Sequence, residues 1–145
     1  MNSIIMEYSD DQVSKILMDT KKIALIDASH NEKKPSNQVM KYLLENNYLV
    51  YPVNNREPDG KIHGINVFQS IDKIPTKIDM VNIFQKNDIA GQTMLTAINL
   101  NIKYIWTQLN IFNFEAASKA IKSGHVVIMN RCTKIEHLKL IKKIY

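Results

Sequence analysis

The stretch Ile23-Ala24-Leu25-Ile26-Asp27-Ala28-Ser29-His30 opens the segment that decides the fold, which runs on to Asn54. Four apolar residues are followed by a polar loop over 27–34, a helix pattern that begins at Pro35-Ser36 and a second apolar run over 48–53. A strand, a helix and a strand within about 30 residues are typical of the βαβ unit of a parallel sheet. In such units a phosphate group is bound where the first strand meets the helix. We therefore expect the functional site at this junction.

The rest of the chain continues the alternation of strands and helices. Ser9 precedes acids and apolar residues at helical spacing, and Asn113 precedes an alanine-rich helix pattern that ends at Gly124. Asp88 is expected to cap the helix between them, with Ile89, Met94, Leu95, Ile98 and Leu100 as its apolar positions. The remaining expected elements are a turn-rich segment over 55–64, a short strand over 65–68, a helical turn over 70–75, and strands over 80–84, 104–109 and 125–129.

This order of elements predicts an α/β, three-layer Rossmann-like fold. We expect a mostly parallel sheet of about five strands with helices on both faces. No repeat or Pro/Gly/Ser-rich linker divides the sequence, so residues 1–145 are expected to form one domain. Residues 1–20 would supply an N-terminal helix that packs on the sheet, and 133–145 a C-terminal basic helix.

The composition is that of a globular protein, with 45% hydrophobic and 23% charged residues among 145. One cysteine excludes an intramolecular disulfide. No apolar run approaches the roughly 18 residues that span a bilayer, and the first eight residues lack the features of a signal peptide. We expect a cytoplasmic protein that does not bind membranes.

The formal net charge is +5, from 19 Lys+Arg and 14 Asp+Glu. The basic residues are spread along the chain, and only the segment 134–143 is locally dense. Nucleic-acid binding requires a clustered basic face. A solvated basic surface is therefore favoured over a nucleic-acid partner, and a small ligand with several phosphates is compatible with the same charge.

Residues just past the strand ends are the candidates for the site, since parallel strands bring them to one edge of the sheet. Nicotinamide dinucleotides are disfavoured for two reasons. The first loop has no glycine, whereas the dinucleotide fingerprint has three, and the second strand ends in Asn54-Asn55 instead of an acid for the ribose hydroxyls. The candidate segments are 28–30, 54, 84–86, 106–110 and 130–132.

Five sequence blocks carry a resemblance to a known family. They are Ile26-Asp27-Ala28-Ser29 with Lys34-Pro35-Ser36, Val50-Tyr51-Pro52-Val53-Asn54, Asp79-Met80-Val81-Asn82-Ile83-Phe84, Trp106-Thr107-Gln108-Leu109, and Asn130-Arg131-Cys132-Thr133-Lys134-Ile135-Glu136-His137. In this order and spacing they resemble the CoA-binding domain proteins, the small stand-alone relatives of the N-terminal domain of the succinyl-CoA synthetase alpha subunit. The set covers the chain from about Ile23 to Leu138.

The resemblance implies that coenzyme A lies across the strand ends. Its diphosphate would lie on the loop 28–30, its adenosine beside 52–54, and its pantetheine arm along 84–86 and 106–108. Lys34 would be a phosphate partner. The implied ligand-binding residues are Ala28, Ser29, His30, Lys34, Ser36, Val53, Asn54, Phe84, Lys86, Trp106 and Gln108.

The chain departs from the family pattern at five positions. Family members usually have glycine at the positions that Asp27, Asn47 and Asn110 occupy in this chain. They usually have proline at the position of Asn55 and aspartate at the position of Asn130. Asp27 places a negative charge where backbone would approach a diphosphate, a repulsion of about 1 kcal/mol or more in a partly buried site. We expect weaker CoA binding than is usual for the family.

Three functional hypotheses follow. The first is a non-catalytic binding protein for CoA or acyl-CoA. The second is an enzyme in which Cys132 or His137 acts on an acyl thioester, or an accessory subunit of an acyl-CoA ligase; a structural or dimer role for Arg131, Glu136 and His137 is favoured over chemistry. The third is a nucleotide- or NAD-sensing module. The His and Cys spacing indicates no metal site, and a homodimer through the last strand region is a further expectation.

Overall fold

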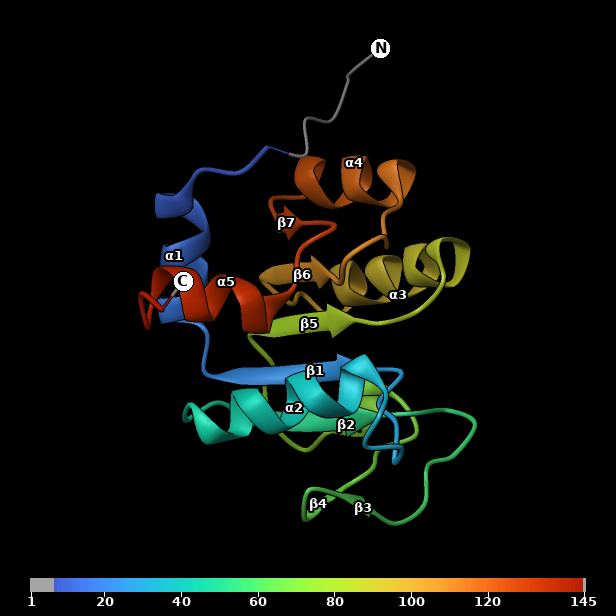
Figure 1. Cartoon of the computed structure of the whole chain (residues 1–145). Coiled ribbons are helices and arrows are strands. Elements are labelled where there is room, and N and C mark those ends of the chain that lie inside the picture. Colours follow the sequence, from blue (N-terminus) through green and yellow to red (C-terminus); the bar gives the residue numbers. More distant parts are fainter. Residues whose placement is uncertain (1–6, 145) are drawn as a thin grey trace.

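The computed structural model describes residues 7–144 and contains a central sheet of five parallel strands (Figure 1). The strands are β1 (Lys22–Ile26), β2 (Leu49–Val53), β5 (Met80–Ile83), β6 (Tyr104–Thr107) and β7 (Val126–Ile128). Their order is β2-β1-β5-β6-β7, and every neighbouring pair is parallel. The expected α/β Rossmann-like fold is confirmed.

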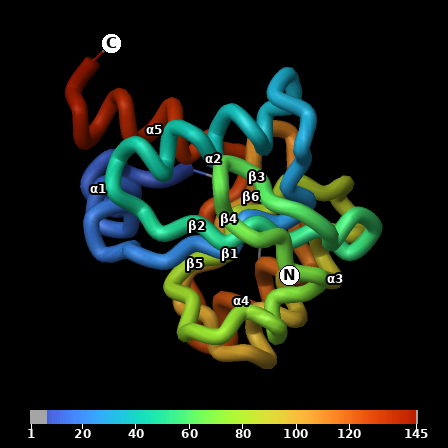
Figure 2. Tube along the Cα trace, turned by 90° about the horizontal axis from the view of Figure 1, so that it is seen from below, coloured from blue at the N-terminus to red at the C-terminus, as the bar shows by residue number. Residues whose placement is uncertain are grey.

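Helices cover both faces of this sheet (Figure 2). One face carries α1 (Asp10–Asp19), α2 (Pro35–Glu45) and α5 (Thr133–Leu140), and the other carries α3 (Asn87–Asn99) and α4 (Phe114–Lys122). Alternate residues of β1 belong to two separate apolar clusters, Ile23 and Leu25 to one and Ala24 and Ile26 to the other. A strand buried on both faces needs a continuous apolar run, which is the pattern seen over 23–26.

The topology places a crevice beside the end of β1. The chain leaves β1 through α2, on one face, and returns as β2 on one side of β1. On the other side β1 pairs with β5, which leads into α3 on the opposite face. At such a switch point the two connections diverge, and ligands bind in the gap that they leave at the carboxyl ends of the strands.

Helix boundaries follow the expected capping residues with small shifts. Ser9 caps α1 by accepting from the Gln12 N–H at 3.1 Å, and Asn113 caps α4 by accepting from the Ala116 N–H at 3.0 Å. Pro35 occupies the first turn of α2. The capping position of α3 is Lys86, two residues before the expected cap Asp88, and the helix begins at Asn87. The helix α5 ends at Leu140, earlier than the expected 133–145 segment.

The segment after β2 forms a hairpin that the sequence predicted only in part. A two-stranded antiparallel ladder joins β3 (Lys61–Ile62) and β4 (Ile65–Asn66) through His63 and Gly64, whose φ angles are 48° and 80°. Two successive residues with positive φ are typical of a type I′ turn. The expected helical turn over 70–75 is present as the 3₁₀ helix η1 (Ile71–Lys73).

The buried face of α3 differs from the one predicted. Its buried residues are Ala90, Gly91, Met94 and Ala97, while Ile89, Leu95 and Leu100 are exposed. The reason is the close approach of α4, because a Cβ on Gly91 would lie 2.3 Å from Nδ2 of Asn113. Small side chains allow this approach, so the largest apolar residues of α3 do not mark its buried side.

Candidate functional site

A cavity of about 520 Å³ opens at the carboxyl ends of the strands. We call it the main cavity. Its walls are the β1–α2 loop, the first turn of α2, the loop after β2 and the ends of β5 and β6. The lining residues are Asp27, Ala28, Ser29, Lys34, Pro35, Ser36, Asn54, Arg56, Glu57, Phe84, Gln108, Leu109 and Ile111.

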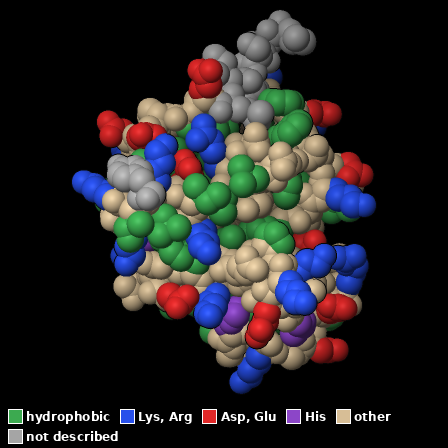
Figure 3. All heavy atoms as spheres, in the orientation of Figure 1, with side chains coloured by type: hydrophobic (Ala, Val, Ile, Leu, Met, Phe, Trp, Pro, Cys, Tyr) green, Lys and Arg blue, Asp and Glu red, His purple; other side chains and the backbone are tan. Residues whose placement is uncertain are grey.

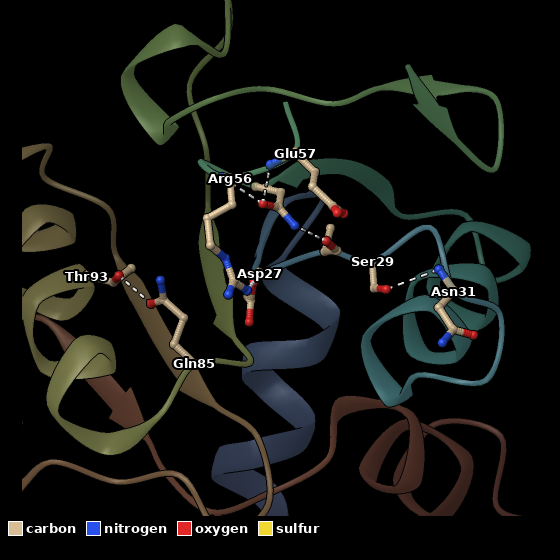
Figure 4. Close-up of polar contacts among 9 residues, drawn as sticks. Asp27, Ser29, Asn31, Arg56, Glu57, Gln85 and Thr93 are labelled. Atoms are coloured by element: carbon tan, nitrogen blue, oxygen red, sulfur yellow. Dashed lines mark hydrogen bonds and ion pairs between the residues drawn. The ribbon is translucent and has the colours of Figure 1, made fainter. Parts of the chain in front are cut away.

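A second cavity, of about 270 Å³, adjoins the first on the side of α3. This side cavity shares Asp27 and Asn54 with the main cavity. Its lining is polar and apolar in about equal parts, and Gln85 accepts a hydrogen bond from the Thr93 hydroxyl at 2.5 Å on its α3 wall (Figure 4). The lining residues are Ile26, Asp27, Val53, Asn54, Asn55, Gln69, Ser70, Ile71, Asp72, Gln85, Ile89, Gln92, Thr93 and Thr96.

Eight of the eleven predicted ligand-binding residues line these two cavities. Asn54 lines both, and Val53 lines the side cavity. The other six line the main cavity and are Ala28, Ser29, Lys34, Ser36, Phe84 and Gln108.

His30, Lys86 and Trp106 line neither cavity. His30 is exposed on the β1–α2 loop, where its Nε2 would lie 3.5 Å from a Cβ on Gly60. Lys86 is exposed at the start of α3. The Trp106 side chain is fully buried, and its Nε1–H donates to the Arg131 carbonyl at 2.8 Å. Trp106 therefore packs in the core and holds the β7–α5 connection in place.

The start of α2 is suited to binding an anion. The N–H groups of Asn37 and Gln38 both donate to the Lys34 carbonyl, which leaves the Ser36 N–H without a protein acceptor in the described part of the chain. The Ser29 hydroxyl oxygen accepts from the Asn31 N–H at 3.1 Å, so its hydrogen remains able to donate (Figure 4). With the Lys34 side chain beside them, these donors lie at the positive end of the helix dipole.

Asn54 fixes the two loops that meet at the site. Its Nδ2 donates to the Ala28 carbonyl at 2.8 Å, and its Oδ1 accepts from the N–H groups of Arg56 and Glu57, both at 2.9 Å. The side chain is buried. These contacts occupy both acceptor positions of Oδ1, so Asn54 shapes the cavities and offers a ligand no further acceptor.

Asp27 lies where the two cavities meet. Its φ of 68° is left-handed, and its N–H and that of Ala28 both donate to the Val53 carbonyl, at 2.9 and 3.0 Å. The carboxylate pairs with Arg56, Nη2 to Oδ1 at 3.2 Å (Figure 4). Arg56 is therefore the residue that partly neutralises this carboxylate.

Gln108 lines the main cavity and carries a buried polar atom that is unpaired among the described residues. The residue is only 8% exposed, its backbone N–H donates to the Ile83 carbonyl, and its Oε1 has no hydrogen-bond partner within residues 7–144. A buried acceptor without a donor costs about 1–3 kcal/mol. A ligand that donates a hydrogen bond here would remove that cost.

Cys132 and His137 are placed in the core at α5, and neither lines the two cavities. The Nδ1 atom of His137 lies 2.7 Å from the Tyr42 hydroxyl, and the rings of Tyr42 and Tyr48 meet its ring edge-on. Burial, with a smaller effect from Lys142, lowers the pKa of His137 below its usual value. Burial also raises the pKa of Tyr48 to about 12. This arrangement supports a structural role in the contact between α5 and α2.

Sequence reasoning missed several residues of the site. Arg56, Glu57 and Ile111 line the main cavity from loops whose course could not be derived from periodicity. The only signal for Arg56 was its position three residues after the end of the second strand pattern. Asn82 of β5 is fully buried and lines neither cavity: its Nδ2 donates to the Thr133 hydroxyl at 2.9 Å, and its Oδ1 has no partner in the described part of the chain.

The surface in Figure 3 carries interspersed basic and acidic side chains. This distribution is typical of a solvated surface. Within residues 7–144 there is no group of three or more His, Cys, Asp or Glu side chains placed to hold a metal ion. None of the helices described is long and apolar enough to cross a membrane.

Three known proteins are similar to this chain over most of its length. The uncharacterized protein YneT of Bacillus subtilis is 26% identical over 129 residues, which cover 89% of this chain and 94% of YneT. A hypothetical protein from Pyrococcus horikoshii has a solved structure with a TM-score of 0.89 and 37% identity, covering 97% of this chain and 98% of that one. A Thermus thermophilus structure gives a TM-score of 0.87 at 25% identity, covering 92% of this chain and 99% of the other.

The match to a family description covers most of the sequence. Residues 21–138 match the family described as a CoA binding domain, a range that contains both cavities and every strand of the sheet. The chain therefore belongs to the CoA-binding domain family.

Proposed function

We propose that this protein binds CoA or an acyl-CoA, non-catalytically, across the main and side cavities. The observation that carries the proposal is the main cavity of about 520 Å³. It brings together the β1–α2 loop, the donors at the start of α2 and the residues that follow β2, β5 and β6. Membership of the CoA-binding domain family supplies the ligand class. A cytoplasmic location is proposed with it, on the composition alone.

The residues present fit three parts of this ligand. The Ser36 N–H, the Ser29 hydroxyl and Lys34 are donors for phosphate oxygens. The side cavity, bordered by Val53 and Asn54, would take the adenosine. The unpaired Oε1 of Gln108 would accept from an amide N–H of the pantetheine arm in the main cavity.

One residue fits poorly. The Asp27 carboxylate lies where the cavities meet, and a diphosphate that crosses from one to the other passes beside it. Like charges in a partly buried site repel. We therefore propose an affinity for CoA below that of relatives with glycine at this position.

The alternatives have less support from the geometry. An enzyme that uses Cys132 or His137 needs one of them beside the thioester, but both are buried at α5 away from the two cavities. An NAD sensor needs an acceptor for the ribose hydroxyls at the end of β2, and the Asn54 acceptor is fully used by backbone N–H groups. A role as an accessory subunit of an acyl-CoA ligase is compatible with the binding function.

Thermal unfolding with a panel of ligands tests the proposal. CoA and acetyl-CoA are expected to raise the unfolding temperature in a concentration-dependent way, because a ligand that binds only the folded state stabilises it. NADH at the same concentrations is expected to have no effect. A shift with NADH and none with CoA would favour the dinucleotide sensor, and release of free thiol from acetyl-CoA would favour the enzyme.

Native mass spectrometry of the purified protein provides an independent measurement. A co-purified species with the mass of CoA or an acyl-CoA is expected, and its mass would identify the acyl group. The same spectra report whether the protein forms the proposed homodimer.

A further inference from the structure

The ion pair between Asp27 and Arg56 lies over the border of the two cavities. Asp27 lines both cavities and Arg56 lines the main one. The Arg56 side chain extends from the loop after β2 towards the Asp27 carboxylate (Figure 4). The guanidinium is therefore held beside the tip of β1, next to the loop on which the diphosphate is proposed to lie.

The pair is weak enough to be broken by a ligand. The side chains of Arg56 and Asp27 are 77% and 33% exposed, and a single contact of 3.2 Å joins them. Exposed pairs of this kind contribute little to stability, because solvent screens them and ordering long side chains costs entropy. By contrast, the backbone at Arg56 is fixed by Asn54. The arginine can change partners through side-chain rotation alone.

We infer that Arg56 is a phosphate-binding residue and that Asp27 is its intramolecular competitor. This inference rests on the proposed function and extends it to the regulation of affinity. In the free protein Arg56 pairs with Asp27. When a diphosphate enters, Arg56 donates to the phosphate oxygens instead, opposite the donors of Ser29, Lys34 and Ser36 across the main cavity.

The competition assigns opposite effects to the two residues. Arg56 favours the bound state through charge-assisted hydrogen bonds. Asp27 opposes it twice, because its pairing with Arg56 must be broken and its carboxylate then faces the diphosphate. A simpler role for Arg56, in which it only neutralises Asp27, predicts that Arg56 has no effect once Asp27 is uncharged.

Calorimetric titration of four proteins distinguishes the two roles: wild type, Arg56→Gln, Asp27→Asn and the double variant. Asparagine is tolerated at positive φ, so Asp27→Asn keeps the backbone of the loop. Asp27→Asn is expected to bind CoA about tenfold more tightly, and Arg56→Gln to weaken binding about tenfold or more in both backgrounds. Pantetheine, which has no phosphate, should show neither effect.

Two further measurements complete the test. Lys41→Gln, which removes a positive charge from the exposed side of α2, is the matched control and should leave CoA affinity unchanged. Inorganic pyrophosphate separates this inference from the proposed function: weaker pyrophosphate binding in Arg56→Gln than in wild type supports the role of Arg56 even if CoA does not bind. The inference is overturned if Arg56→Gln in the Asp27→Asn background leaves the affinities for CoA and pyrophosphate unchanged, or if wild type binds neither ligand.

Discussion

At the scale of single residues, four of the five departures from the family pattern share one backbone conformation. Asp27, Asn47, Asn110 and Asn130 all have φ between 61° and 71°. Glycine adopts this region freely, and Asp and Asn are the other residues that tolerate it best. At Asn130 the side chain also accepts from the Asn110 N–H at 2.6 Å. An amide oxygen performs that task as an aspartate would. Of these four residues only Asp27 lines the two cavities, so it is the one whose charge acts on the site.

The conformation of Asn47, at the end of α2, can be tested by stability measurements. Asn47→Ala is expected to lower the free energy of unfolding by about 1 kcal/mol, because alanine at positive φ is strained. Asn47→Gly should have no such cost, since glycine is the preferred residue at a left-handed helix end. Urea denaturation of both variants measures the difference, and equal stabilities would show that the residue is not left-handed in solution.

Gln108 gives a residue-scale prediction for the site. Gln108→Leu removes the unpaired acceptor while keeping the side-chain volume, so the unfolding free energy should stay the same or rise. CoA affinity should fall about tenfold, the equivalent of about 1.4 kcal/mol for one lost hydrogen bond. Gln12→Leu, on the exposed side of α1, is the control. Unchanged CoA affinity in Gln108→Leu would remove this residue from the pantetheine path.

Residue roles were harder to predict from the sequence than residue positions. Trp106 and Gln108 were expected to line the same path, because the family resemblance implies that the pantetheine arm lies along 106–108. The end of the strand separates them: Trp106 lies within β6 and belongs to the core under α5, whereas Gln108 lies past the strand end at the main cavity. The sequence pattern predicts the strand, but not the residue at which the strand ends.

At the scale of elements, the contact between α2 and α5 depends on a buried neutral histidine. His137 on α5 lies against Tyr42 of α2 and Tyr48 before β2. The Tyr42 hydroxyl lies 2.7 Å from Nδ1, and burial lowers the pKa of the imidazole below its usual 6.5. The arrangement explains why the Glu136-His137 pair of the sequence packs as structure and lines neither cavity.

A pH dependence of stability follows from this lowered pKa. In the unfolded chain His137 is protonated as the pH falls through about 6.5, whereas in the folded protein it stays neutral until the lower pKa is reached. The free energy of unfolding should therefore fall with decreasing pH across that window, and the contribution of His137 is fully lost below the folded-state pKa. Urea denaturation between pH 7.5 and about 5 should show a smaller fall in His137→Gln than in wild type. An identical slope in the two proteins would contradict the assignment.

Element boundaries were predictable where local chemistry sets them. Ser9, Pro35, Asn113 and Gly124 mark helix ends that the structure confirms. The buried face of α3 was not predictable in the same way, because Gly91 lies against Asn113 at the start of α4, and Ala90 and Ala97 pack in the cluster that includes strand residues and residues of α4. Contacts between distant elements override the apolar periodicity of a single helix.

At the scale of the whole molecule, the sheet order brings the site together from four parts of the chain. The ends of β1, β2, β5 and β6 lie side by side, and the loops that follow them line the main cavity. The alternating pattern of the sequence is enough to predict this edge. The shared border of the two cavities at Asp27 and Asn54 needed the structure, since it depends on how the loop after β2 folds back over β1.

Isothermal titration of the wild-type protein with CoA is the most direct test of whether the protein binds CoA across the main and side cavities. We expect the wild-type protein to give a saturable heat of binding with one CoA per chain and a weaker affinity than Asp27→Asn. We also expect adenosine 3′,5′-bisphosphate to compete with CoA for the same site. The absence of any saturable heat at millimolar CoA, in both wild type and Asp27→Asn, would contradict the proposed binding.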